Sequence, residues 1–451
     1  MMEKQQPAGD RGSNRVIAVV FAALLIDLLG FTLILPLFPS ILEHFSKSND
    51  TFYQTLQNGV DCFASAVGVP QERKYNSVLF GGLIGTIFSL LQFFCSPLTG
   101  AASDYIGRRR VMMITSVGLI VSYALWAISR SFGVFILSRI VGGLSKGNVS
   151  LCTAIIADLP SLKKRSTGMA MIGVAFSLGF TLGPMIGAYF AMDTSGEEIF
   201  YVRPAILAIL FSVADLVFIF LLLPETLTKE NRVSSVAAGF QGASDLLSPF
   251  ALFHFSAVTR RKDSPSSESL QRLQLLGMVY FLYLFLFSGL EYTLSFLTHQ
   301  RFQFDSMQQG KMFFFIGVTM ALIQGGYARR ISPGNEIKTV KRAIILLIPA
   351  FLLIGWANSL MMLGTGLLLY SFAAAIVVPC LSSVVSTYGS ASRKGTVMGI
   401  LRSLGALARA LGPILSATLY WVAGAEICFS VCAFLFLIPL ICLRRLKAKE
   451  E

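Results

Sequence analysis

Residues 100–110 read Gly-Ala-Ala-Ser-Asp-Tyr-Ile-Gly-Arg-Arg-Arg and separate two long apolar segments, 76–99 and 111–129. A segment of roughly 20 mostly apolar residues is long enough to cross a bilayer as an α-helix. Gly100 and Gly107 allow the chain to turn tightly within the polar stretch. The stretch therefore predicts a short connection between two helices that span a membrane.

Composition extends this interpretation to the whole chain of 451 residues. The sequence is 54% hydrophobic and 14% charged, with a mean hydropathy of +0.69, whereas soluble domains carry about 25% charged residues. We predict an all-α membrane protein of twelve transmembrane helices. The predicted spans are 16–38, 76–99, 111–129, 132–157, 167–190, 204–223, 273–298, 311–328, 343–358, 361–386, 396–419 and 424–443.

The chain divides into two halves of six predicted spans each. We expect an N-terminal six-helix bundle at 1–223, a partly mobile cytoplasmic linker at 224–272 and a C-terminal bundle at 273–451. Leu182-Gly183-Pro184 recurs as Leu411-Gly412-Pro413 in the second half. Many secondary transporters are built from such repeats and bind their substrate between them, near the bilayer midplane.

The distribution of basic residues predicts the orientation in the membrane. Of the 37 Lys and Arg residues, 26 lie in the segments that share a side with the N-terminus, seven lie on the opposite side if Lys311 at the edge of its span is included, and four lie within spans. Lys and Arg are enriched in cytoplasmic loops. We therefore expect both termini in the cytoplasm, in the plasma membrane or an endomembrane, and we do not interpret the net charge of +13 as a nucleic-acid site.

The remaining features limit the possible functions. The seven cysteines show no metal-ligand spacing, and no nucleophile motif or phosphate-binding loop occurs. We expect no enzyme activity, no metal, no cofactor and no disulfide framework, and we expect a monomer. The long non-cytoplasmic loop at 39–75 contains Asn49-Asp50-Thr51, an acceptor for N-glycosylation at Asn49.

The stretch at 100–110 resembles the loop signature of the major facilitator superfamily, and three more segments resemble its drug/proton antiporter branch. These segments are Ile26 to Pro39, Arg139 to Gly143 and Gly179 to Gly187, and Leu223-Pro224-Glu225-Thr226-Leu227 is a common ending of the sixth span. The resemblance covers nearly the whole chain. It implies the major facilitator fold and an exporter or antiporter of organic anions.

Two groups of residues predict features that control conformation: a contact between the halves and a hinge in a helix. Gly100, Asp104, Gly107, Arg108 and Arg109 would form a latch that joins the halves on the cytoplasmic side, with Asp104 bound to an arginine or to a helix N-terminus. The alternative is that the arginines only set the topology. In the fifth span, Gly179, Gly183 and Gly187 share a helix face next to Pro184, which predicts a hinge or, alternatively, a packing face.

Charged residues within spans are functional candidates, because each costs at least about 2.5 kcal/mol at the middle of a helix. They include Asp27, Arg139, Lys146, Asp215, Glu291, Arg402 and Arg409. We predict that Asp27 and Arg139 form a proton-coupling pair, because a moving arginine would change the proton affinity of the carboxylate. A static ion pair is the alternative.

The remaining charges suggest the substrate. Lys146 and Arg409 could clamp an anion, with Arg402 beside them, whereas Glu291 could neutralise Lys146 or bind a cation. Phe31 and Tyr292 are aromatic candidates for the wall of the pocket.

These patterns favour alternating access with proton antiport of small amphipathic organic anions. A facilitative uniporter and an exporter of organic cations or drugs remain the alternatives. Repeated half-bundles with glycine-rich helices favour a transporter over a channel.

Overall fold

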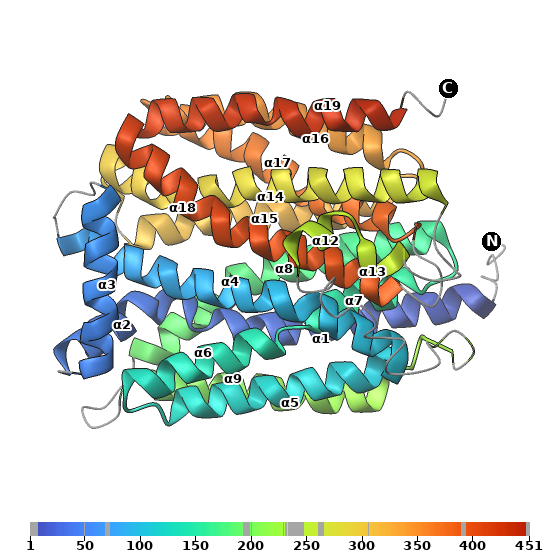
Figure 1. Ribbon diagram of the computed structural model, residues 1–451, viewed down its shortest axis with the longest axis horizontal. Helices are drawn as coiled ribbons and strands as arrows, with labels where there is room; N and C mark the ends of the chain where they lie inside the picture. Colours follow the sequence, from blue (N-terminus) through green and yellow to red (C-terminus); the bar gives the residue numbers. More distant parts are fainter. Residues whose placement is uncertain are drawn as a thin grey trace, which may run out of the picture.

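The computed structural model describes residues 8–48, 50–67, 73–192, 199, 201–228, 230, 232, 248–259, 266–304, 306–388 and 394–447. The described part of the chain is helical and contains no strand. Most of the helices run along the long axis of the molecule, and α3 lies across one end (Figure 1).

The described residues of the first half contain ten helical elements. They are α1 (Ala8–Thr32), η1 (Leu35–Leu37), α2 (Phe38–Lys47), α3 (Thr51–Val67), α4 (Arg73–Ile106), α5 (Arg108–Ala127), α6 (Phe132–Ser145), α7 (Asn148–Ala157), α8 (Leu162–Met192) and α9 (Val202–Leu222).

The rest of the described chain contains α12 (Pro249–Phe253), α13 (Ser256–Thr259), α14 (Ser267–Phe302), α15 (Ser306–Gly326), η3 (Ala328–Arg330), α16 (Glu336–Gly355), α17 (Leu360–Val385), α18 (Lys394–Leu435) and α19 (Leu437–Lys447). We call the end of the molecule where α1 begins and α19 ends the termini end; it lies on the right in Figure 1.

Each of the twelve predicted spans is helical. Ten segments of the described chain are long and apolar enough to cross a membrane, and α4 and α16, with 34 and 20 residues, also have the required length. The predicted span at 132–157 is two helices, because the chain breaks at Lys146 and Gly147 between α6 and α7. The last two predicted spans adjoin at Gly424, whose φ of 82° interrupts the helical backbone.

The segment 39–75, which the sequence predicts to be a loop, contains two helices, and this corrects the prediction. Helices α2 and α3 form there, and Ile41, Leu42 and Phe45 of α2 are buried. They join a cluster of apolar residues with Phe132 and Tyr201. These segments fell below the apolar length that predicts a span, so sequence patterning missed them. The predicted glycosylation site, Asn49, lies outside the described residues.

Part of the predicted linker is also helical. Short helices α12 and α13 bury Leu252, Phe255 and Val258. Helix α14 begins at Ser267, before residue 273, the predicted start of the span. At this start the side chain of Ser266 accepts a hydrogen bond from the backbone N–H of Ser269 at 3.3 Å. Most of the remaining predicted linker lies outside the described residues.

One side chain joins two helices at the end opposite the termini. The carboxylate of Asp50 accepts hydrogen bonds from the backbone N–H groups of Phe52 and Tyr53, at 2.9 and 3.0 Å, in the first turn of α3. Its second oxygen accepts a bond from the N–H of Phe132 at the start of α6, at 2.9 Å. This last bond contributes most to holding the pKa of Asp50 below its ordinary value.

We predict that Asp50→Ala lowers thermal stability at about pH 7 by about 1 kcal/mol, the usual cost of losing a helix cap. Because the folded pKa is lowered, Asp50 stabilises the protein above the ordinary aspartate pKa, and this contribution is lost as the pH falls through the folded value. The measurement is thermal unfolding in detergent at about pH 7 and about pH 3. Asp50→Asn is the matched control, because it can cap a helix without titrating. Equal acid sensitivity of the wild type and both variants would contradict the prediction.

Candidate functional site

The two halves meet through a buried carboxylate. Asp104, at the end of α4, accepts hydrogen bonds from the backbone N–H groups of Gly395 and Thr396 at 3.0 and 2.7 Å, and from the Thr396 hydroxyl at 2.6 Å. These groups form the first turn of α18, where the helix dipole favours negative charge. Asp104 is only 1% exposed, so water does not weaken this contact between the halves.

Glycines allow the helices to come this close. A Cβ on Gly100 would lie 2.3 Å from the carbonyl oxygen of Gly395, and a Cβ on Gly399 would lie 2.6 Å from that of Ser96. Both distances are too short for any larger residue without a shift of backbone, so α4 and α18 pack backbone to backbone.

Arg108 balances the charge of Asp104. Its Nη1 lies 2.5 Å from Asp104 Oδ1, and its Nε lies 3.1 Å from Asp158 Oδ2. Glu225 accepts hydrogen bonds from the backbone N–H groups of Arg108 and Arg109, at 2.9 and 3.3 Å, and so caps α5. Gly107 precedes this cap with a φ of 112°, a conformation that favours glycine. The structure therefore brings the five predicted latch residues into one region.

Further contacts between the halves went unnoticed in the sequence. Lys394 donates a hydrogen bond to the carbonyl oxygen of Ala157 at the end of α7. The hydroxyl of Ser177 on α8 donates to Gln324 Oε1 on α15 at 2.9 Å. No spacing in the sequence relates residues so far apart along the chain. These hydrogen bonds, together with those of Asp104, Thr167 and Ser403 between the halves, lie in the part of the molecule nearer the termini end.

A buried ion pair lies inside the first half. Lys146 Nζ is 2.6 Å from Asp27 Oδ2, and the two residues are 4% and 2% exposed. The same ammonium lies 4.5 Å from the centre of the Phe31 ring. Lys146 stands at the break between α6 and α7, with φ of −78° and ψ of 58°.

This pair corrects the predicted contact between Asp27 and Arg139. The guanidinium of Arg139 lies over the rings of Trp126 and Phe135, at 5.5 and 5.8 Å, and its Nη2 has no hydrogen-bond partner. The prediction identified the wrong base because it treated residues 132–157 as one continuous helix. The break after Ser145 gives Lys146 a different direction.

Arg402 is a buried cation between the halves. It belongs to α18 and is 6% exposed, and its guanidinium lies 5.9 Å from the centre of the Phe176 ring on α8. Its Nε has no hydrogen-bond partner, and among the described residues the side chain makes no hydrogen bond or ion pair. A buried charge without a counter-ion is costly, so this position favours an anion.

The three remaining members of the predicted substrate group are Arg409, Glu291 and Tyr292. Arg409 is half-buried and lies within electrostatic range of Glu291, whose side chain is exposed although it belongs to the long helix α14. Tyr292 is half-buried, with its ring centre 5.5 Å from that of Phe296. Of the two cations of the predicted clamp, Lys146 forms an ion pair with Asp27, whereas Glu291 lies within electrostatic range of Arg409.

The predicted hinge glycines form a close contact within the first half. A Cβ on Gly179 or Gly183 would lie 2.6 or 1.8 Å from atoms of α1, and one on Gly187 would lie 2.1 Å from the carbonyl oxygen of Leu33, the residue that follows α1. The Thr32 hydroxyl on α1 also donates a hydrogen bond to the carbonyl oxygen of Gly179, at 2.9 Å. Helix α8 continues past Pro184. These contacts favour the packing alternative, and a hinge stays a prediction.

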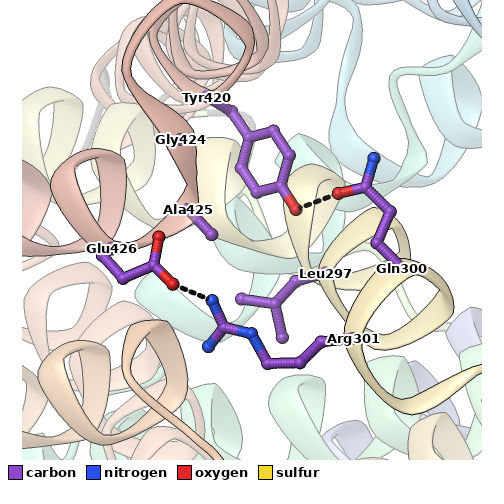
Figure 2. A pocket seen from close by; sticks show the side chains of 7 residues that line it. All are labelled: Leu297, Gln300, Arg301, Tyr420, Gly424, Ala425 and Glu426. Atoms are coloured by element: carbon purple, nitrogen blue, oxygen red, sulfur yellow. Dashed lines mark hydrogen bonds and ion pairs between the residues drawn. The ribbon is translucent and has the colours of Figure 1, made fainter.

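A pocket of about 340 Å³ lies near the opposite end of the second half. Figure 2 shows Arg301 directed towards Glu426, and Tyr420 bound to Gln300. Arg301 also donates hydrogen bonds to the carbonyl oxygens of Gly355 and Ala357. Because these polar groups already bind one another, we interpret the pocket as a joint between α14, α16 and α18 and not as a ligand site.

Comparisons with known proteins agree with this architecture. The profile of the Major Facilitator Superfamily matches residues 20–413. The chain is 62% identical to mouse major facilitator superfamily domain-containing protein 10, over 99% of this chain and 96% of the relative. It is 27% identical to the class D tetracycline resistance protein of Salmonella ordonez, over 90% of each chain. The crystal structure of the human organic anion transporter MFSD10 (TETRAN) is 62% identical, with a TM-score of 0.92, over 97% of this chain and 100% of that chain.

We predict that Asp104→Asn loosens the contact between the halves. Loss of one member of a buried ion pair costs about 3–5 kcal/mol, so Ser96, which is 2% exposed where α4 meets α18, should become accessible more often. In a Ser96→Cys background, a water-soluble maleimide should modify residue 96 roughly ten-fold faster or more. Peptide mass spectrometry measures the rate at this position.

Asp61→Asn is the control for this experiment, because it makes the same chemical change on α3, away from α18. An unchanged modification rate in folded Asp104→Asn protein would show that the carboxylate does not hold the halves together.

Proposed function

Because this chain belongs to the major facilitator superfamily, we propose that it carries small organic anions across a membrane by alternating access, in exchange for protons. Its relatives are multi-pass membrane transporters and not enzymes, which confirms the predicted fold and class of protein. The substrate class, the proton coupling and the orientation are the proposal.

The observation that carries the anion preference is the unpaired guanidinium of Arg402. It is buried between the halves, where an alternating-access protein binds its substrate. A guanidinium binds a carboxylate through two parallel hydrogen bonds, and the neighbouring Phe176 offers an aromatic surface to the apolar part of the solute. The name of the human relative, an organic anion transporter, supports the same substrate class.

In this proposal Arg409 and Lys146 contribute less than Arg402 to binding of the substrate anion. Asp27 forms an ion pair with Lys146 and Glu291 lies within electrostatic range of Arg409, so an anion would meet a carboxylate near either cation. Arg402 replaces the Lys146–Arg409 clamp as the main anchor.

The contacts between the halves support an alternating-access cycle. They lie towards the termini end, so the arrangement is closed there. With the termini in the cytoplasm, as the basic residues predict, this is a state that receives or releases solute on the non-cytoplasmic side. Opening to the cytoplasm would require Asp104 to leave the first turn of α18.

Proton coupling is proposed through Asp27 and Lys146. A proton on Asp27 would weaken its bond to Lys146, because only the ionised carboxylate forms a strong charge-assisted bond. The resemblance to tetracycline resistance proteins favours antiport.

A second candidate is proton–anion symport, and the same ion pair favours it. Protonation of Asp27 would leave Lys146 without a counter-charge, and the bound anion could take that place. The proton and the anion would then bind together, which is the opposite of exchange.

We predict that Arg402→Gln raises the KM for an anionic dye by roughly 10- to 100-fold, because a charge-assisted hydrogen bond contributes about 1.5–3 kcal/mol. The assay is uptake of fluorescein into proteoliposomes, compared with rhodamine 123, a cation of similar shape. Arg402→Lys should be intermediate, and rhodamine should be unaffected. Arg272→Gln, near the start of α14, is the matched control, because Arg272 pairs with Glu268 on the same helix. An unchanged fluorescein KM in Arg402→Gln would sink the proposed anchor.

We predict that fluorescein flux responds to an imposed pH gradient in the wild type and that Asp27→Asn abolishes the response. Antiport requires the dye to move against the direction of proton flow, and symport requires it to move with the protons. Asp27→Asn leaves Lys146 buried without its partner, so Asp27→Asn/Lys146→Gln, which removes both charges, is measured beside it. A full response to the gradient in the double variant would exclude Asp27 as the coupling residue.

A further inference from the structure

Several buried polar atoms in the first half have no hydrogen-bond partner, and three of them belong to titratable side chains near the Asp27–Lys146 ion pair. These three are the hydroxyl of Tyr123 on α5, Nη2 of Arg139 on α6 and Oδ1 of Asp215 on α9. The three residues are 2%, 6% and 1% exposed. Buried polar groups are nearly always paired, so each exception calls for an explanation. None of the contacts described above uses these three atoms.

The three groups belong to one neighbourhood. Tyr123 lies within electrostatic range of both Arg139 and Asp215, and also of Asp27. Asp215 in turn lies within range of Asp27 and Lys146. The unpaired atoms therefore adjoin the Asp27–Lys146 ion pair.

The packing of α1 against α9 agrees with this placement. A Cβ on Gly30 of α1 would lie 3.4 Å from Cβ of Phe211 and 3.8 Å from the hydroxyl of Ser212 on α9. Asp27 lies three residues before Gly30, and Asp215 lies three residues after Ser212. Since α1 runs away from the termini end and α9 runs towards it (Figure 1), both acids lie about one turn from this contact, on the same side of it.

Charge balance indicates which form of Asp215 this arrangement holds. The charged and titratable groups around it on the neighbouring helices are Asp27, Tyr123, Arg139, Lys146 and Cys152. Asp27 already uses Lys146, and Oδ1 of Asp215 receives no donor. A buried carboxylate without a donor is costly by several kcal/mol, whereas a neutral carboxyl in the same place costs less because it carries no charge. The arrangement therefore suits a proton on Asp215.

We propose that Asp215 is a second proton-carrying carboxyl of this protein, with Arg139 as the cation that receives it after the proton leaves. The proposal deepens the proton coupling proposed above and rests on it. The O–H bond of Asp215 breaks, and the proton passes to a water molecule of the open cavity. The resulting carboxylate accepts a hydrogen bond from the Tyr123 hydroxyl, whose oxygen accepts one from Arg139 Nη2.

This exchange keeps the site electrically balanced. With Asp215 ionised, two carboxylates, Asp27 and Asp215, face two cations, Lys146 and Arg139. With Asp215 neutral, Arg139 is left over, as the unpaired Nη2 in this structure shows. Tyr123 acts here as a positioning residue, because its hydroxyl connects the acid to the arginine.

Two measurements on purified protein in proteoliposomes test the proposal. Infrared difference spectroscopy should show the C=O band of a neutral buried carboxyl that is lost as the pH rises and is absent in Asp215→Asn. In the same variant, fluorescein flux driven by a pH gradient should fall roughly ten-fold or more, whereas fluorescein exchange without a gradient should persist.

Two further variants complete the design. Tyr123→Phe should shift the pH profile of driven flux and leave exchange unchanged, which a purely structural tyrosine would not do. Asp61→Asn on α3 is the matched control and should change neither signal.

The outcomes separate this inference from the proposed function. If wild-type flux responds to the gradient and Asp215→Asn responds equally, with the infrared band retained, Asp215 carries no proton and the inference is wrong. If the wild type itself gives no response to a gradient of either sign, the proposed proton coupling fails, and this inference fails with it.

Discussion

The contact on which the arrangement of the two halves depends is that of the Asp104 carboxylate with the first turn of α18. Asp104 is almost fully buried, so its charge must be offset, and Arg108 and the helix dipole do so together. The contact can form only because Gly100, Gly395 and Gly399 let the two backbones approach each other. Removing any of these features would leave a buried charge without compensation at the closed end, so the polar and the steric requirements depend on each other.

The requirement that a buried charge be offset also applies to the charged residues inside the helices. Residues that do not meet this requirement are candidates for a functional role. Paired groups such as Asp27 and Lys146 are stable in a medium of low polarity. The guanidinium of Arg402 and the carboxyl of Asp215 lack such partners. In a membrane protein, where ionisable residues within helices are costly, such incomplete pairing is typical of groups whose partner arrives during the working cycle. For Arg402 the partner that we propose is an anion, and for Asp215 it is a proton.

Sequence patterning predicted the spans well and the partners poorly. Apolar length decides whether a helix can cross a bilayer, so the twelve segments could be located from composition. The interruption at Lys146 could not, because residues 132–157 have the length and mean hydropathy of one span and Gly147 alone does not end a helix. That error gave Asp27 the wrong base. The 100–110 stretch indicated an acid bound to a helix N-terminus but not which helix, and nothing in the sequence connected Lys394 with Ala157.

The broken backbone between α6 and α7 has a mechanical effect. Irregular backbone at membrane depth is tolerated only where protein or water satisfies it, and here the N–H of Gly147 binds the carbonyl of Ser145 at 2.8 Å. A lysine on an intact helix could redirect its stem only within the few rotamers its turn allows. Lys146 lies between two helices, so small rotations about its φ and ψ bonds would change the direction of the ammonium without unwinding either flanking helix. In the proposed cycle, an exchange of the counter-ion of Lys146 would therefore be a local movement, faster than the movement of whole helix bundles.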